Sequence, residues 1–441
     1  MKRINAILGF ILICTGTVFA QHPLLQSGPM LGYSEMREVL IWVQTKQPAM
    51  VYVEYLPNDG TVPVRRTNYV FTTKEKAFTA KMIADSVVDG TRYTYRLVIN
   101  NEIASLPYQT EFQTQKIWKW RGDPPEFTFT AGSGAYINET EFDRPGMPYG
   151  GEYQIYSAIH QHNPDFMIWL GDNIYLREAD WNSMTGILGR YTHTRSTPEM
   201  QPLLANTHHY AVWDDHDYGP NDSDKGFWNK ANTLKAFDYF WGNPSVGVHD
   251  IEGAISSFQW ADIDFFMLDN RWYRDPNNSK MPHKTQLGEQ QLQWLFDNLT
   301  SSLASFKVVV LGGQFLSTAG LFETYTSNGF AEERQRIIDY IYKQNIRNVV
   351  FLTGDVHFTE LSVLRSDGKP TIWDMTFSPF NSGANFRGES WNNTLRVPGT
   401  VVGDRNFGKV RFFGTIKERK MEISSYDSNN NLKWTKVVEQ E

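Results

Sequence analysis

The chain has 441 residues, which is enough for two domains, one of them large. Hydrophobic residues make up 41% and charged residues 21%, a globular composition that excludes a coiled coil or a mainly disordered chain. The formal net charge of -7 gives no electrostatic footprint for nucleic acid and suits a protein that gathers cations.

The first twenty residues have the features of a secretory signal peptide. Lys2 and Arg3 precede a short apolar run, and small residues before the expected cleavage site end at Ala20. The run is shorter than the roughly 20 residues of a membrane anchor, so we expect cleavage after Ala20 and an exported protein without a transmembrane segment. A buried N-terminal strand or helix is the alternative. Cys14, the one cysteine, lies inside this segment, so the mature chain is expected to lack a disulfide and a thiolate ligand.

Residues 23–117 are predicted to form a small all-β sandwich domain. Short alternating runs at residues 39–43, 50–55 and 91–97 are separated by turn signals, and helical periodicity is weak. No catalytic residue types cluster here. We therefore expect a packing or positioning domain.

The pattern changes after a linker at residues 118–125. Compact apolar runs are typical of strands buried on both faces, and they occur at residues 126–131, 165–170, 263–268, 307–311 and 348–352. Helix-like segments at residues 289–296 and 332–341 lie between them. The pattern predicts an α/β layered domain over residues 126–425, with residues 426–441 extending the last strand region.

An acid-rich stretch at residues 213–224 follows a short strand-like run. It holds five carboxylates, His216 and Asn221. Like charges this close repel and raise one another's pKa, so the stretch is either fully solvated or binds a multivalent cation. Interleaved aromatic residues and a proline favour a fixed, half-buried loop and therefore a metal site.

Polar residues also follow the other predicted strands, where ligands bind in open α/β sheets. A dinuclear hydrolase needs a bridging carboxylate, further ligands and a proton donor near the leaving oxygen. Suitable ligands are Asp172, Asp215, Asp355, His357 and, as a phenolate, Tyr175. His216 can donate a proton, and Arg177 can hold a phosphate oxygen or form a surface ion pair. Asn173 is a carbonyl ligand or a turn residue.

Five motifs carry a family resemblance, and they read Gly-Asp-Asn-Ile-Tyr (171–175), Trp-Asp-Asp-His-Asp (213–217), Leu-Asp-Asn-Arg (268–271), Gly-Gly-Gln (312–314) and Gly-Asp-Val-His (354–357). In this order they resemble the alkaline phosphatase D (PhoD-like) branch of the calcineurin-like metallophosphatases. The resemblance covers residues 126–425, and the early sandwich is similar to a small N-terminal domain that these enzymes often carry.

The resemblance implies a four-layer α/β/β/α metallophosphatase domain that hydrolyses phosphate mono- or diesters with a metal-activated hydroxide. It implies two metal ions, usually Fe3+ and Ca2+. Asp172 would bridge them, Tyr175 would bind iron, and Asp215, Asp355 and His357 would complete the ligands, with His216 catalytic. Arg177 is a second catalytic candidate because of its own chemistry and not because of the resemblance. Further candidates for contact with metal or substrate are Tyr136, Asn173, Asp214 and Asn221.

One position departs from the family pattern. Relatives commonly carry a cysteine ligand in a Ser-Cys-x-Tyr motif, and this chain has Gly134 between Ser133 and Ala135. Either Tyr136 or water fills the place, or the site holds ions that prefer oxygen. Tyr136 can also close the site without touching metal.

Two alternative functions stay open. The first is a catalytically weakened relative that binds a phosphorylated ligand without efficient turnover, as the missing thiolate suggests. The second is a calcium-stabilised adhesion module in which residues 214–224 are structural. For an enzyme, we expect the loops at residues 145–150, 185–194 and 379–383 to select the substrate.

Overall fold

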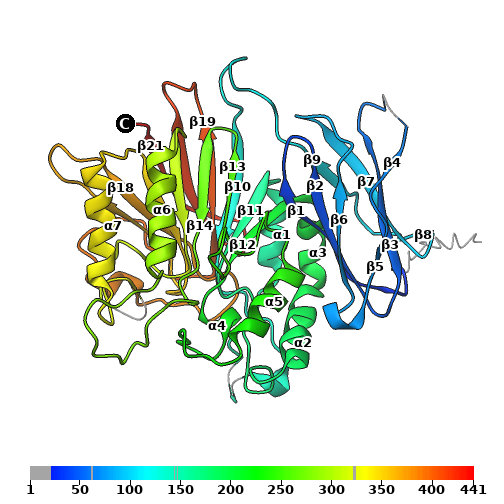
Figure 1. Ribbon diagram of the computed structural model, residues 1–441, viewed down its shortest axis with the longest axis horizontal. Helices are drawn as coiled ribbons and strands as arrows, with labels where there is room; N and C mark the ends of the chain where they lie inside the picture. The colour runs from blue at the N-terminus through cyan, green and yellow to red at the C-terminus, as the bar shows by residue number, and fades with distance from the viewer. Residues whose placement is uncertain (1–20, 61–62, 144, 147, 321–323) are drawn as a thin grey trace, which may run out of the picture.

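The computed structural model describes residues 21–441 except 61–62, 144, 147 and 321–323. The predicted signal peptide, with Cys14, lies outside the described residues. Two large β-sheets face each other, helices cover their outer sides, and a smaller third sheet stands at one end (Figure 1). This arrangement confirms the predicted α/β/β/α layers and the all-β N-terminal region.

The first large sheet has nine strands and mixed direction. In order across the sheet they are β21 (Leu432–Glu439), β20 (Lys420–Asp427), β19 (Asn406–Phe413), β10 (Phe127–Gly132), β11 (Phe166–Leu170), β12 (His208–Val212), β1 (Leu25–Ser34), β2 (Val39–Thr45) and β6 (Thr79–Ala84). Strands β10, β11 and β12 run parallel at its centre. Their polar continuations therefore leave the sheet at the same edge.

The second large sheet has six strands, most of them parallel. They are β13 (Ser256–Trp260), β14 (Ile263–Met267), β15 (Phe306–Val310), β16 (Val349–Thr353), β18 (Ile372–Thr376) and β17 (Glu360–Leu364). Its inner face packs on the first sheet through an aromatic core, in which Phe129 stacks on Phe166 and both meet Phe265 edge to face. The predicted apolar runs all lie on strands because both faces of each strand are covered.

Helices cover the two outer faces. The first sheet is covered by α1 (Gln154–Gln161), α2 (Met184–Arg195), α3 (Gln201–Asn206) and α5 (Lys230–Phe240), and the second by α6 (Glu289–Ser301) and α7 (Ala331–Lys343). Short 3-10 turns are η1 (Lys74–Lys76), η2 (Thr140–Phe142), η3 (Pro198–Met200) and η4 (Gly388–Ser390). Residues 185–194, which we expected as a substrate loop, belong to α2.

The acid-rich stretch begins with a short helix, α4 (Asp215–Tyr218), where the sequence predicted a loop. Asp214 and Asp217 form a capping box, in which each side chain accepts a hydrogen bond from the backbone of the other. Two of the five carboxylates thus satisfy backbone N–H groups and start the helix.

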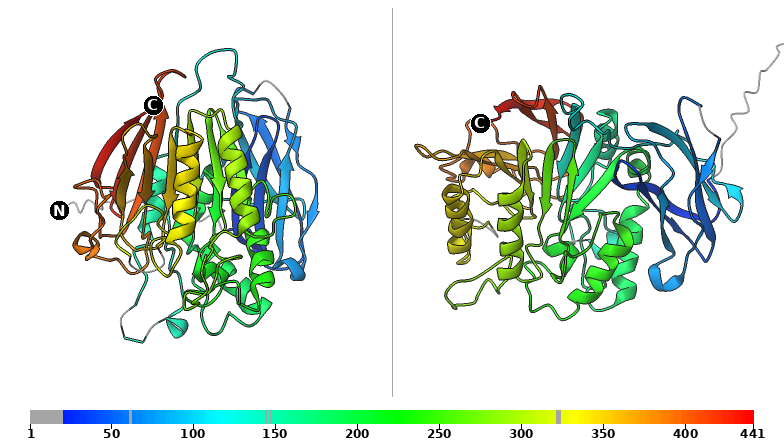
Figure 2. Two further views of the ribbon diagram at one scale, coloured as in Figure 1. Left: turned by 60° about the vertical axis from the view of Figure 1, so that its left-hand side comes forward. Right: turned by 45° about the horizontal axis from the view of Figure 1, so that its top comes forward.

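The third sheet closes the N-terminal sandwich. Its strands are β3 (Met50–Pro57), β4 (Arg65–Arg66), β5 (Val70–Phe71), β7 (Arg92–Ile99), β8 (Glu102–Ile103) and β9 (Glu111–Gln113). It packs on the β1, β2 and β6 end of the nine-stranded sheet, and Figure 2 shows it in blue at one end of the molecule. Since β1 pairs in parallel with β12, the opposite wall of the sandwich continues into the central sheet.

His208 joins the sandwich to the central sheet. Its Nδ1 lies 2.9 Å from the Gly32 carbonyl oxygen and therefore donates to it, so Nε2 accepts from the Gln113 N–H at 3.4 Å. Burial lowers the pKa of His208 to about 4, and that of the adjacent His209 to about 3. The folded protein thus keeps both rings neutral in weakly acidic solution.

We predict that stability falls as the pH falls from about 6.5 towards 4, because the unfolded chain takes up protons on these rings before the folded one does. The His208 shift alone corresponds to about 3 kcal/mol at about 1.4 kcal/mol per pKa unit. In urea unfolding across this pH range, the free energy of unfolding of His208→Gln is expected to depend less steeply on pH than that of the wild type. The surface variant His283→Gln is the control, and an equally steep pH dependence in His208→Gln would contradict the assignment.

Candidate functional site

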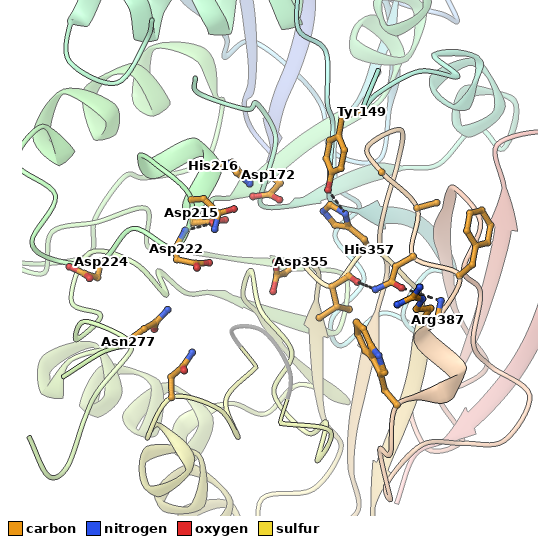
Figure 3. Close-up of a pocket in the computed structure, with 18 of the residues that line it drawn as sticks. Tyr149, Asp172, Asp215, His216, Asp222, Asp224, Asn277, Asp355, His357 and Arg387 are labelled. Carbon is orange, nitrogen blue, oxygen red and sulfur yellow. Dashed lines mark hydrogen bonds between the residues drawn. The ribbon is translucent and has the colours of Figure 1, made fainter. Parts of the chain in front are cut away.

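The polar segments after β11, β12 and β16 meet at the carboxyl ends of these strands and form the floor of one cavity of about 1030 Å³. Figure 3 shows Asp172, Asp215 and His216 grouped together, with Asp355 and His357 beside them and Tyr149 in contact with His357. The described residues that line it include Tyr149, Asp172, Asp215, His216, Asn221, Asp222, Asp224, Asn277, Asn328, Asp355, His357, Gly383, Phe386, Arg387 and Trp391. Six predicted site residues are thereby brought together: Asp172, Asp215, His216, Asn221, Asp355 and His357.

Three residues of this floor have unusual backbone conformations. Asp172, Asp355 and His357 have φ of 50°, 72° and 60°, in the left-handed region that favours glycine. Such a residue costs of order 1–3 kcal/mol and persists where the surrounding structure holds it, most often at functional sites. This strain makes the three strand-end residues candidates for a functional role.

Asp172, Asp215 and His216 form a group that can hold a metal ion. One ligand atom from each lies within 4.8 Å of the others. Asp172 is 1% exposed, and its Oδ1 has no hydrogen-bond partner in the part of the chain that the structure describes. A buried carboxylate oxygen in this state needs a counter-charge.

The pKa values of the two carboxyls are driven apart. Burial, followed by the charges of Asp215 and Asp214, raises the pKa of Asp172 well above its usual range. Burial also acts to raise the pKa of Asp215, but the charges of His216 and Arg271 lower it below its usual range. A cation at Asp172 would relieve this repulsion, and the oxygen and nitrogen donors suit a hard or borderline ion. The residues present therefore fit a metal centre.

Tyr175 connects this group to His357. Its hydroxyl donates to Asp172 Oδ2 at 2.9 Å and lies 3.3 Å from His357 Nε2. The other ring nitrogen of His357, Nδ1, is 3.0 Å from the Tyr149 hydroxyl. Burial and the charge of Asp172 raise the Tyr175 pKa well above its usual range, so the phenolate needs a nearby cation to form.

Tyr136 supports the aromatic wall behind this chain of contacts. Its ring packs edge to face on Tyr175, with centroids 4.7 Å apart, and on Tyr149, with centroids 4.9 Å apart. Its hydroxyl donates to Asp143 at 2.7 Å. Tyr136, like Tyr175, is not among the described residues that line the cavity, and these contacts place it in the aromatic wall of the site.

Asn173 and Asp214 lie below the cavity floor. Asn173 donates through Nδ2 to the Val212 carbonyl at 2.8 Å, and its backbone N–H donates to Asp217. Asp214 Oδ1 accepts from Arg271 Nε at 2.5 Å and from Asn270 Nδ2 at 3.0 Å. Both residues brace the strand ends from beneath.

The glycines of two sequence motifs are explained by close packing on Asp214. A Cβ at Gly171 would stand 2.6 Å from the Asp214 Cβ, and a Cβ at Gly312 would stand 2.6 Å from its Cγ. Neither position has room for a side chain. The Gly-Asp, Gly-Gly-Gln and Leu-Asp-Asn-Arg segments thus meet around one buried carboxylate.

Arg177 is not among the described residues that line the cavity, and its Nε lies 3.7 Å from Glu178. Arg387 is the one arginine among those residues. Arg387 was not predicted, because it comes from a loop far away in sequence, whereas Tyr149 belongs to the loop at residues 145–150 that we expected to select the substrate but was not singled out there. The sequence did predict that the loops at residues 145–150 and 379–383 lie near the substrate, and Tyr149 and Gly383 from these loops do line the cavity.

We predict that Arg271→Met destabilises the protein by about 3–5 kcal/mol, because it leaves Asp214 buried without its charged partner. Chemical unfolding measures the loss. The double variant Asp214→Asn/Arg271→Met should recover part of it, and Arg387→Met on the cavity rim should have little effect. A small loss of unfolding free energy in Arg271→Met would contradict the role of this pair. So would a double variant whose loss equals the sum of the losses in Asp214→Asn and Arg271→Met.

Two facing sheets with helices outside and metal-ligating residue types at the strand ends define the metallophosphatase fold class. A sequence model of the PhoD-like phosphatases matches residues 140–436, and one described only as a domain of unknown function matches residues 22–117. The chain therefore belongs to the PhoD-like phosphatase family. No described helix has the length and apolar character that crossing a membrane requires.

Individual relatives agree with this family. Alkaline phosphatase D of Bacillus subtilis (strain 168) is 25% identical over 334 residues, which are 65% of this chain and 54% of that protein, so the chain spans about half the length of this curated relative. A solved structure of PhoD aligns with a TM-score of 0.75 at 19% identity, covering 95% of this chain and 93% of that one. The purple acid phosphatase PPD1 from yellow lupin (Lupinus luteus) seeds gives 0.66 at 12%, covering 93% and 74%. These two likenesses show the fold.

Proposed function

We propose that the protein is an exported, metal-dependent phosphoesterase that hydrolyses phosphate mono- or diesters at a dinuclear centre. The observation that carries this proposal is the buried Asp172 Oδ1, which faces other carboxylates on the floor of an open cavity without a hydrogen-bond partner in the described chain. Family membership supports the reaction type. Export rests on the leader pattern of residues 1–20.

The ligands of the two ions would come from three strand ends. Asp172 would bridge, Tyr175 would bind the first ion, and Asp215, Asp355 and His357 would complete the set, with Asn221 near the rim. Two bound ions lower the pKa of a water molecule and neutralise charge on the phosphate oxygens. Fe3+ with Ca2+ is the pair we propose from the family resemblance, and Tyr175 is the residue that favours the trivalent ion.

His216 and Arg387 are the residues we assign to the substrate. His216 lines the cavity beside Asp172 and Asp215, and its ring lies against Tyr175 with centroids 4.3 Å apart. From there it would donate a proton to the leaving oxygen. Arg387, exposed on the opposite rim, would hold a phosphate oxygen through its planar fork. The carboxylate side of the cavity repels free anions until cations are bound, which couples substrate binding to metal binding.

We predict that Asp172→Asn lowers kcat/KM at least about 10³-fold, or about 4 kcal/mol, on p-nitrophenyl phosphate or bis-p-nitrophenyl phosphate. The amide keeps the shape of the side chain but removes the bridging charge. Asp165→Asn is the matched control, because Asp165 stands at the other end of β11, where it accepts from the Thr128 N–H.

A weakened relative that only binds a phosphorylated ligand is the second candidate, favoured by the missing side chain at Gly134. Equal, low rates in the wild type and Asp172→Asn, together with retained phosphate binding in both, would replace the enzyme proposal with this one. Loss of hydrolysis on chelation, restored by added metal, would support the enzyme.

We predict different effects from the two arginines. Arg387→Ala should raise KM about ten-fold, near 1.5 kcal/mol, because a hydrogen bond to a charged group is lost, with a smaller change in kcat. Arg177→Ala should change either constant less, since Arg177 does not line the cavity in the described structure. Steady-state kinetics on the same ester measures both effects. A larger rise of KM in Arg177→Ala than in Arg387→Ala would contradict this assignment and favour Arg177 as the phosphate contact.

A further inference from the structure

Gly134, where the family resemblance implies a cysteine, leaves no empty space for a side chain. A Cβ built on Gly134 would stand 2.7 Å from Ser382 Oγ and 3.1 Å from Pro379 Cβ. Unbonded carbon and oxygen atoms do not approach that closely, and the φ of 75° also disfavours a side chain. The hydroxyl of Ser382 thus stands where the side chain of residue 134 would begin.

Ser382 is held in this place by backbone contacts. Its N–H donates to the Gly134 carbonyl at 3.0 Å, and the N–H of the preceding Asn381 donates to the same oxygen at 3.2 Å. The Asn381 side chain in turn donates to the Tyr136 carbonyl at 2.8 Å. These hydrogen bonds hold residues 381–382 against residues 134–136, so the position of Ser382 does not depend on its own hydroxyl.

The Ser382 hydroxyl is fully buried next to a phenol. Ser382 is 0% exposed, and no hydrogen bond of normal geometry reaches its Oγ from the described residues. Its side chain interacts with the Tyr175 phenol, and the Gly134 segment on which it packs is joined to Asp172, because the Ala135 N–H donates to the Asp172 carbonyl at 2.8 Å. The same phenol contacts Asp172, whose Oδ1 is also unpartnered among the described residues. Two buried oxygens that need an electropositive partner thus flank one phenol.

We propose that Ser382 Oγ is a metal ligand on the Tyr175 side of the centre and takes the place of the thiolate that Gly134 cannot supply. This inference rests on the metal-dependent function proposed above. A neutral oxygen there replaces an anionic sulfur, so the site carries one negative charge less and prefers ions that bind oxygen. Asp172, Tyr175 and Ser382 then form an all-oxygen set.

Metal affinity tests the proposal without relying on activity. The full mature chain is stripped with a chelator and titrated with Mn2+ by calorimetry, comparing wild type, Ser382→Ala, Asp172→Asn and Ser425→Ala. Ser425 is the matched control, a serine on β20 that is 0% exposed and whose Oγ has no hydrogen bond within the described residues. Ser382→Ala should weaken binding at least about ten-fold, as loss of a ligand or its support does, with Ser425→Ala unchanged.

The outcomes separate the two proposals. Wild-type affinity in Ser382→Ala, with weakened binding in Asp172→Asn, would overturn the role of Ser382 and leave the metal-dependent function standing. A wild-type chain that binds no Mn2+ and shows no metal-dependent hydrolysis would overturn both.

A second variant reads the ligand directly. Ser382→Cys places a thiol at the position of Oγ, and the mature chain has no other thiol if the leader holding Cys14 is removed. Loaded with Co2+, it should show thiolate-to-cobalt charge-transfer absorption, and Ser425→Cys should not. A folded, Co2+-loaded Ser382→Cys protein without that absorption would contradict the proposal, and if this variant does not fold, the calorimetry decides.

Discussion

The buried ion pair between Asp214 and Arg271 is the contact on which the site depends. Both side chains are almost fully enclosed, 1% and 0% exposed. Asp214 caps the helix that carries His216, while Gly171 and Gly312 pack directly on it, so three strand ends are fixed around one carboxylate. A buried pair of this kind contributes little net stability, because desolvation offsets attraction. Its effect here is positional, since it holds the segments that present Asp172 and Asp215.

Arg271 cannot balance all the acids around it. Burial, and among the charges that of Asp214, raise the pKa of Asp217 to about 8, and burial raises that of Asp172 well above its usual range. Left-handed backbone at Asp172 and Asp355 adds strain at the same edge. These costs lie where the cavity opens and not in the aromatic core between the sheets. These costs fit the proposed metal centre, in which a bound cation would supply the missing charge.

The sequence predicted what is local. Strands such as β11 and β16 follow from compact apolar runs, and the clustering of Asp172, Asp215 and Asp355 follows from the rule that parallel strands end at one edge. Three features depend on contacts between distant segments and were missed. The first is the parallel pairing of β12 with β1, and the second is the capping box formed by Asp214 and Asp217. The third is the position of Tyr149 and Arg387 in the cavity wall, since they come from separate loops. Apolar periodicity carries no information about such pairings.

Gly134 has one meaning in the sequence alone and another beside its neighbours in the fold. In the sequence it is the loss of a ligand and favours a weakened relative. In the structure the space is occupied by Ser382, held on the Gly134 carbonyl by its own backbone N–H. Without the Gly134 conformation the hydroxyl could not stand there, because a Cβ at residue 134 would clash with it. The two residues are therefore coupled by packing, and the proposed exchange of ligand type accounts for both: the loss of a side chain at residue 134 makes room for the buried hydroxyl of Ser382.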